Sequence, residues 1–432
     1  MMSLPSVVKV AQKLIQFDTT NPPGNEIACV DYLKEIFTQA GFDTKVLARE
    51  PHRANLIARL PGLGEAPPLL FYGHLDVVTT ENQQWTHPPF AGHIDEKSYL
   101  WGRGSLDMKG GVAMLATSVI EAQKRGITPA GDIIFCAVAD EEAGGDFGAS
   151  YLVNEHAELF KDVKYAIGEF GGFSIRFGGM TYYPIMVGEK QICHVRARAK
   201  GVSGHASVPI KNGAINKLAQ FIGRLEERPP AIFIEPPVRQ LIEAVAKSVP
   251  QILGLLDKDK ADAVLAGLGP HAPIFAPLLR ATVCPTMLTG SSILNVIPAE
   301  ATADLDCRLL PSQKPDDVLG YLEKMANGLV DIELVRYEEG TGRPDMSLFD
   351  MLGSILSGVD EGATACPFIL SGSTDGRHFK RLGIQTYGFT PLALPPEFDF
   401  FNLAHAPDER VPTSALEFGV EALVELIKRY SC

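Results

Sequence analysis

The first 190 residues carry apolar positions in two alternating periods. Apolar residues at helical spacing predict helices at 5–16, 26–40, 109–125 and 149–158. Between these segments, short apolar runs predict strands at 43–48, 55–60, 68–77, 132–139 and 164–169. Such alternation is typical of an α/β domain, so we expect a mostly parallel sheet flanked by helices.

The pattern changes after residue 190. Strands with alternating burial and amphipathic helices are expected at 192–201, 213–227, 299–308, 315–327 and 331–339. This order predicts an antiparallel sheet with two helices on one face. The α/β pattern resumes at 341 and ends in a predicted helix at 412–430. The segment 228–285 is rich in Pro, Ala and Leu and carries no chemical motif, so the sequence gives it no place.

Length and composition limit the class of protein. A chain of 432 residues exceeds one compact core, which favours two domains. The net charge of −13 and the lack of a basic run argue against nucleic-acid binding. No apolar run is long enough for a membrane span, and the start lacks the core of a signal peptide. Seven scattered cysteines without CxxC spacing favour reduced thiols, so a cytoplasmic location is expected.

Acidic and imidazole side chains follow several of the predicted strands. They occur in FYGHLDVV (71–78), LWGRGSLDMKGG (100–111), IIFCAVADEEAGG (133–145), YAIGEFGG (165–172) and FNLAHAPDE (401–409). Sites in α/β sheets collect beyond the carboxyl ends of strands, which is where these residues fall. Carboxylates with imidazoles are typical ligands of hard or borderline divalent cations. Because there is enough carboxylate for two cations, we expect metal-assisted hydrolysis.

These segments, with GVSGHASVP (201–209) and SGSTDGRHF (371–379), carry a resemblance to a family. From about residue 5 to about 430 the chain resembles the co-catalytic-zinc exopeptidases and deacylases. That group includes acetylornithine deacetylase, succinyl-diaminopimelate desuccinylase, aminoacylase-1 and glutamate carboxypeptidase. The resemblance implies a catalytic domain formed by 1–190 and 341–432. It also implies an inserted α+β lid at 191–340, which carries the dimer contact in many relatives, so we expect a homodimer.

The resemblance implies five metal ligands and two Zn²⁺ per subunit. Asp107 would bridge the two ions and precede a cis peptide bond. His74 and Glu169 would complete one ion, and Glu142 and His405 the other. The carboxylate-rich set would also accept Mn²⁺ or Co²⁺.

Three further residues are expected to act in catalysis. Asp76 lies two residues from His74 on the same face of a strand, where it could accept the imidazole N–H. Glu141 is expected to be the general base, because a carboxylate crowded by anions has a raised pKa. Taken alone, the acidic turn 140–142 would instead be interpreted as solvated. The resemblance implies that His205 stabilises the oxyanion, from a partner subunit or by lid closure; a surface histidine in a polar loop is the alternative.

A free carboxylate on the substrate would be recognised by arginine, whose planar fork matches it. Arg308 and Arg377 are the candidates, although an alternating strand also exposes arginine without a function, as Arg308 could be. Asn295, Ser373 and Thr374 are expected to contribute hydrogen bonds at the same end of the substrate.

The predicted function is therefore a binuclear zinc amide hydrolase that cleaves N-acyl amino acids or small peptides with a free carboxylate. Deacylase and carboxypeptidase activity both remain open. One departure is Asp408, where several relatives have asparagine, so this segment does not indicate a specific deacetylase. The alternatives are a hydrolase of N-carbamoyl (ureido) amino acids and a non-catalytic metal-binding dimer. The second is disfavoured because Glu141 and every expected ligand are present.

Overall fold

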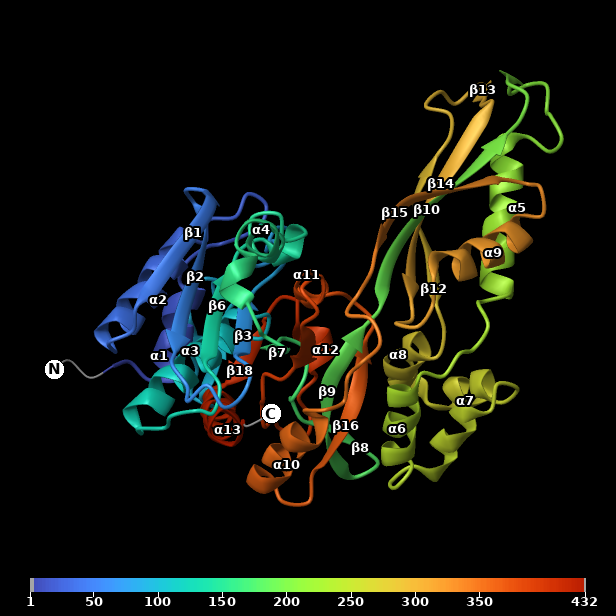
Figure 1. Ribbon diagram of the computed structural model, residues 1–432. Coiled ribbons are helices and arrows are strands. Elements are labelled where there is room, and N and C mark those ends of the chain that lie inside the picture. The colour runs from blue at the N-terminus through green and yellow to red at the C-terminus, as the bar shows by residue number, and fades with distance from the viewer. Residues whose placement is uncertain (1–3, 431–432) are drawn as a thin grey trace.

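The computed structural model describes residues 4–430 and shows a broad α/β body from which a long lid projects (Figure 1). The body is built from both ends of the chain, and the lid comes from its middle. Among the described residues, no helix is long and apolar enough to cross a membrane.

One large sheet forms the centre of the body, in the order β1-β2-β6-β3-β7-β17-β9-β16, with β8 paired to β9. Its strands are β1 (Thr44–Glu50), β2 (Arg53–Leu60), β3 (Leu69–His74), β6 (Ile133–Val138), β7 (Tyr165–Gly168), β8 (Ile175–Phe177), β9 (Met180–Glu189), β16 (Thr364–Leu370) and β17 (Gln385–Gly388). The central neighbours β6, β3, β7 and β17 are parallel, whereas β1, β2 and β6 pair antiparallel. The prediction of a mostly parallel sheet flanked by helices is confirmed.

Helices cover both faces of this sheet because successive side chains of each central strand point to opposite faces. Leu69 and Phe71 of β3 join the core of one face, and Leu70 and Tyr72 join the core of the other. The helices of the body are α1 (Val7–Ile15), α2 (Ile27–Gln39), α3 (Lys109–Lys124), α4 (Ala149–Glu155), α10 (Phe349–Val359), α11 (Gly376–Lys380), α12 (Phe400–Leu403) and α13 (Thr413–Arg429). Every residue of β3 and β6 is buried, as expected for strands covered on both sides.

The lid is an antiparallel sheet in the order β12-β14-β10-β15. Its strands are β10 (Gln191–Lys200), β12 (Thr282–Thr289), β14 (Glu300–Leu309) and β15 (Asp331–Glu338). Alternate residues of β10 and β14 are buried under two helices, α5 (Ala214–Glu227) and α9 (Pro315–Ala326). The two-strand ribbon of β11 (Gly204–His205) and β13 (Val296–Ile297) lies at the far end of the lid (Figure 1). The sequence pattern predicted β10, β14, β15 and the two helices on one face, but not β12 or the ribbon.

The helical part of the segment 228–285 packs against the body, although it lies within the range expected for the lid, and only its end, from Thr282, enters the lid sheet as β12. It contains α6 (Pro236–Val245), α7 (Ala261–Gly267) and α8 (Ala272–Phe275). The apolar face of α6, with Leu241, Ile242 and Val245, joins the main core of the body beside β16. Because β16 is an edge strand of the large sheet, α6 covers an edge that would otherwise be open to pairing. The compact lid therefore excludes these helices.

Leu241→Ala should destabilise the protein by roughly 3 kcal/mol, because it leaves a cavity where α6 meets the body. Leu241 is buried, whereas Leu253 in the same segment is 46% exposed. Leu253→Ala should therefore change the free energy of unfolding by less than about 0.5 kcal/mol. Chemical denaturation of both variants checks the packing, and equal losses would contradict it.

Candidate metal centre

Three parallel strands end at one edge of the sheet and deliver four acidic or imidazole side chains there. His74 is the last residue of β3, and Glu169 directly follows β7. Glu141 and Glu142 occupy a single 3-10 turn, Glu141–Ala143, after β6. Because β6, β3 and β7 are neighbours, their carboxyl ends meet, and the four side chains converge.

Two loops bring Asp107 and His405 to the same place. Asp107 precedes α3, and its peptide bond to Met108 is cis, as the resemblance implies. His405 follows α12 and has a φ of 65°. The strands β5 (Tyr99–Trp101) and β18 (Arg410–Pro412), next to these loops, pair antiparallel in a small sheet with β4 (His93–Ile94). This pairing holds the two loops together.

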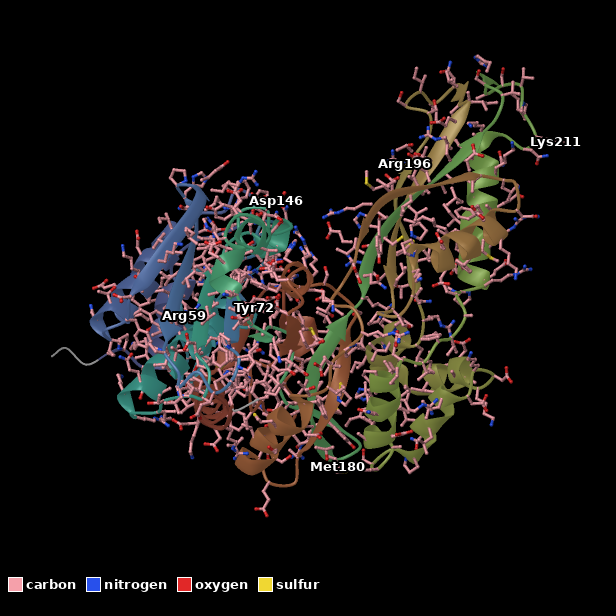
Figure 2. The ribbon with its side chains drawn as sticks, viewed as in Figure 1. Arg59, Tyr72, Asp146, Met180, Arg196 and Lys211 are labelled. Atoms are coloured by element: carbon pink, nitrogen blue, oxygen red, sulfur yellow. The ribbon has the colours of Figure 1, made fainter. Side chains whose placement is uncertain are left out.

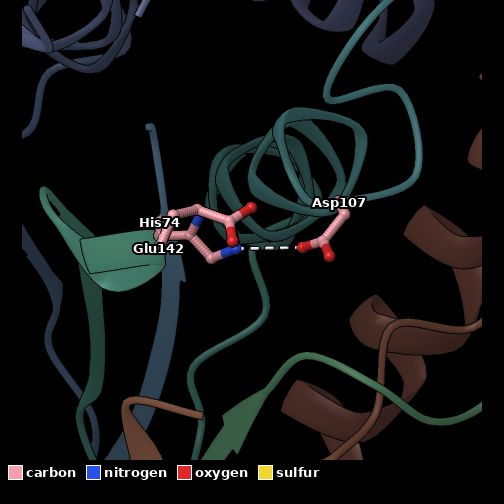
Figure 3. A group of neighbouring side chains, drawn as sticks. All are labelled: His74, Asp107 and Glu142. Atoms are coloured by element: carbon pink, nitrogen blue, oxygen red, sulfur yellow. Dashed lines mark hydrogen bonds and ion pairs between the residues drawn. The ribbon is translucent and has the colours of Figure 1, made fainter. Parts of the chain in front are cut away.

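Asp107 lies between the two histidines. Its Oδ1 is 3.0 Å from Nε2 of His74, and its Oδ2 is 3.0 Å from Nε2 of His405. Glu169 Oε2 lies 3.4 Å from the His74 nitrogen, and Glu142 Oε1 lies 3.2 Å from the His405 nitrogen. Figure 3 shows His74, Asp107 and Glu142 converging, with the contact from His74 to Asp107 dashed.

This donor set fits divalent cations. The ligand atoms of His74, Asp107 and Glu142 lie within 4.8 Å of one another, and so do those of His74, Glu141 and Glu169. Each side of Asp107 thus offers an imidazole and a carboxylate, which suits zinc and related metals. The structure brings together all five residues that the resemblance implies as ligands.

The cluster holds buried negative charge that attracts protons or cations. Hydrogen bonds to Asp107 and Glu142 raise the pKa of His405 to about 10. Burial raises the pKa of Glu169 to about 8. Burial, with the charge of Glu169, also raises the pKa of Glu141 well above its ordinary value. Cations would replace the protons on these groups and remove the cost of the buried charge.

The Asp76 carboxylate lies 3.6 Å from the His74 Nδ1 atom, near the imidazole as expected, but the backbone of Asp76 is nearer. The His74 Nδ1 atom lies 3.0 Å from the backbone oxygen of Asp76, so the main chain orients the imidazole. The Asp76 carboxylate also accepts the backbone N–H groups of Glu141 and Glu142, each at 3.0 Å. The side-chain amide of Asn21 donates to it at 2.8 Å. The N–H groups of Glu141 and Glu142 need acceptors, and the Asp76 carboxylate supplies them. Asp76 therefore fixes the turn that carries Glu141, the base candidate, and Glu142, an expected ligand.

Sequence reasoning missed two buried networks that support the site. Glu409 accepts the backbone N–H groups of Leu106 and Asp107 and pairs with Arg103 at 2.6 Å. Arg103 also donates to the carbonyl of His405. The Arg103–Glu409 pair therefore holds the Asp107 loop and the His405 loop together. GRG and PDER were visible in the sequence, but nothing in them showed that they pair.

The second network joins the N-terminal region to the acidic turn. Asn21 bridges Asp76 and Asp140, with its amide 2.9 Å from the latter. Arg53 pairs with both Glu26 and Asp140 at 2.8 Å. All these side chains are buried. Isolated polar residues give no periodic signal of their partners, so only the folded chain revealed this network.

Arg377 is the arginine that lies beside the base candidate. It is 7% exposed, and its Nη1 lies 3.7 Å from Glu141 Oε1. It lines a cleft of about 790 Å³ between the acidic turn and the end of β15, with Gly144 and Glu338 in the walls. Arg377 thus places a positive charge next to the carboxylate cluster.

Other expected substrate residues do not reach the cluster. Arg308 pairs with Asp306 on the lid sheet, at 2.8 Å. The backbone N–H and hydroxyl of Thr374 donate to Glu189, at 2.8 and 2.9 Å, and Ser373 is half-buried nearby. His205 and Asn295 lie at the tip of the lid, where Lys211 of the same loop marks the far end in Figure 2. Within one copy of the chain, His205 and Asn295 therefore lie away from the metal-ligand cluster.

Comparison with known proteins identifies the family. A profile of the peptidase family M20/M25/M40 matches residues 70–429, so the chain belongs to this family of metal-dependent amide and peptide hydrolases. A probable carboxypeptidase S-like 2 of Dictyostelium discoideum is 29% identical over 388 residues, 87% of this chain and 74% of that protein. A probable succinyl-diaminopimelate desuccinylase of Staphylococcus aureus (strain MRSA252) is 30% identical over 325 residues, 74% and 72% of the two chains.

A third relative is the N-fatty-acyl-amino acid synthase/hydrolase PM20D1 of Xenopus tropicalis, 27% identical over 381 residues, 84% of this chain and 72% of that protein. Among solved structures, the M20 metallo-carboxypeptidase Sso-CP2 of Sulfolobus solfataricus shares the fold with a TM-score of 0.71 and 18% identity, covering 99% of each chain. The YXEP protein of Bacillus subtilis, a dinuclear metal-binding peptidase, has a TM-score of 0.62 at 13% identity and covers 98% of each chain.

Glu409→Gln should destabilise the protein by roughly 3 kcal/mol, because Arg103 would remain as a buried charge without its partner. Both side chains are fully buried. The matched control is Glu121→Gln, whose partner Lys124 lies on the surface and whose loss should cost less than about 1 kcal/mol. Denaturation curves of the two variants give the comparison, and similar losses would count against a supporting role for this pair.

The metal-free protein should lose stability as the pH rises from neutral toward 10. The raised pKa of His405 means that its stabilising contribution is complete below the ordinary value of 6.5 and is lost as the pH approaches about 10. Glu169, neutral at low pH, becomes a buried anion as the pH passes its pKa of about 8, which also lowers stability. Melting temperatures in a chelator across this pH range check the sign. A flat or rising profile would contradict it, and the metal-loaded protein should decline less.

Proposed function

We propose that the protein is a two-metal amide hydrolase that acts on N-acyl amino acids or short peptides with a free carboxylate. The observation that carries this proposal is the position of Asp107 between His74 and His405, with Glu141 directly beside the cluster. Zinc is the metal that the donor set favours, and manganese or cobalt would also suit it.

When bound, the two cations would supply Lewis-acid activation of water and of the scissile carbonyl. Glu141 is the residue that takes the proton of the attacking water and gives it to the leaving amine. Its raised pKa suits both steps, because burial and the charge of Glu169 make the carboxylate a better base than a solvated one. The Asp76 carboxylate keeps Glu141 in place by accepting the backbone N–H of Glu141.

Arg377 would bind the substrate carboxylate. The Arg377 guanidinium lines the cleft and lies 3.7 Å from Glu141 Oε1, so a carboxylate bound to it would sit close to the site of hydrolysis. The relatives named as a carboxypeptidase, a desuccinylase and a fatty-acyl-amino acid hydrolase are consistent with a substrate built on an amino acid. Ser373, half-buried near Arg377 in sequence, could add a hydrogen bond.

His205 and Asn295 would complete the site from a second copy of the chain or by movement of the lid. The N–H of Ala206 donates to the carbonyl of Asn295 at 3.0 Å, so the two residues form one unit at the lid tip. Val208 and Leu294 expose apolar side chains on the same tip, 67% and 101% exposed. An exposed apolar tip that also carries polar groups favours a homodimer. The scattered cysteines without CxxC spacing support the cytoplasmic location that we propose.

The test is amine release by the metal-loaded protein from N-acetyl, N-succinyl, long-chain N-acyl and N-carbamoyl amino acids and from dipeptides, with a chelated control. Amine release from the N-acyl amino acids or from the dipeptides that stops on chelation supports the proposal. Which of these two substrate classes is hydrolysed separates deacylase from carboxypeptidase activity. Release from the N-carbamoyl group alone would favour the ureido hydrolase. No release by protein with two bound metals would favour a binding role instead.

Glu141→Ala should keep two metal equivalents and lose turnover by roughly 10²–10⁴-fold, because it removes the general base but no ligand. Glu142→Ala is the matched variant. The Glu142 carboxylate lies 3.2 Å from the His405 imidazole, so its removal should cost one metal equivalent. Elemental analysis and single-turnover rates separate the two. Activity retained in Glu141→Ala would remove it as the base, and two equivalents retained in Glu142→Ala would remove that ligand.

A further inference from the structure

The lid touches the arginine of the site through Glu338. The chain passes between body and lid at Glu189–Gln191, where β9 meets β10, and again after β15, whose last residue is Glu338. The two connections run side by side, since a Cβ built on Gly340 would lie 3.1 Å from the Glu189 carbonyl. Glu338 therefore sits at the junction on which any movement of the lid depends.

Glu338 faces the one nitrogen of Arg377 that lacks a hydrogen bond. Nη1 of Arg377 donates to the carbonyl of Thr374 at 2.8 Å, and Nη2 donates to that of Gly144 at 3.3 Å. Nε is buried and has no hydrogen-bond partner within residues 4–430, but it lies 3.4 Å from Glu338 Oε2. The carboxylate is thus near enough to neutralise the guanidinium, yet it is not bonded to it.

Glu338 is held in this position as an anion. Burial raises its pKa, but the hydrogen bond from Arg336 and the charges of Arg336, Arg377 and His378 outweigh this and lower the pKa. Its side chain is 27% exposed, and that of Arg377 is 6% exposed, so solvent screens the pair less than it would a surface pair. Both residues line the same cleft, together with Ala143 at the end of the turn that carries Glu141.

We propose that Glu338 is a specificity-determining residue that occupies the carboxylate position of Arg377 until a substrate carboxylate displaces it. This inference rests on the proposed role of Arg377 as the carboxylate anchor. Two carboxylates cannot occupy the same edge of the Arg377 guanidinium without repelling each other. A ligand therefore binds Arg377 only if its carboxylate interacts with the arginine strongly enough to displace Glu338.

The alternative is that Glu338 only ties the lid to the body. The two roles predict opposite effects of Glu338→Gln on the binding of an anion. If Glu338 competes with the ligand, its neutralisation strengthens anion binding. If Glu338 only holds Arg377 in place, its neutralisation weakens binding or leaves it unchanged.

The experiment measures binding of 4-methylpentanoate, a carboxylate that cannot be hydrolysed, to the metal-loaded full chain by calorimetry. We expect Glu338→Gln to lower the Kd about fivefold, the size typical of a partly exposed ion pair. Glu339→Gln is the matched control, since Glu339 lines the same cleft, is exposed and does not pair with Arg377. The neutral amide of the same acid should bind both proteins equally.

The gain must also depend on Arg377. In the Arg377→Gln background, Glu338→Gln should no longer strengthen binding, which separates displacement at Arg377 from a general change in charge. An unchanged or higher Kd in Glu338→Gln, a gain that persists without Arg377, or no binding to either protein would each overturn the inference. Substrate turnover plays no part in this readout, so failure of the proposed function would show separately in the amine-release assay.

Discussion

The buried negative charge around Asp107 is the constraint on which the rest of the structure depends. Carboxylates taken out of water need protons, cations or donated hydrogen bonds to remain there. The histidines next to Asp107 partly meet this need, and their carboxylate neighbours raise the pKa of His405 to about 10. The same charge gives the site its affinity for divalent cations. Three strand ends and two loops converge to create it.

Convergence of this kind requires support outside the ligands themselves. The loops of Asp107 and His405 come from distant parts of the chain, and the buried pair of Arg103 and Glu409 joins them. The acidic turn is held in the same way, because Asp76 accepts its backbone N–H groups. Each supporting carboxylate is fully satisfied by donors, which is why it can be buried beside other anions.

The lid adds a second level of organisation. Its tip carries His205, which only another copy or a movement of the lid could bring to the centre, whereas its base carries Glu338 next to Arg377. One end of the lid is therefore remote from the chemistry and the other touches it. The helices of 228–285 pack on the body beside β16, and the segment is also bonded to the lid through Glu235 and Ser312. Glu338 therefore belongs both to the last strand of the lid and to the cleft that Arg377 lines.

The sequence by itself determined the fold class and the main helices and strands of residues 5–169, because burial periodicity is a local property of the chain. The five expected ligands followed from short motifs that resemble a family. The predicted helix at 109–125 differs from α3 by one residue at its end. Only the tertiary structure decided what Asp76 binds, that Arg103 meets Glu409 and where 228–285 packs. These outcomes depend on which distant donors and apolar faces meet after folding, and a polar residue in a loop carries no periodic signal of its partner.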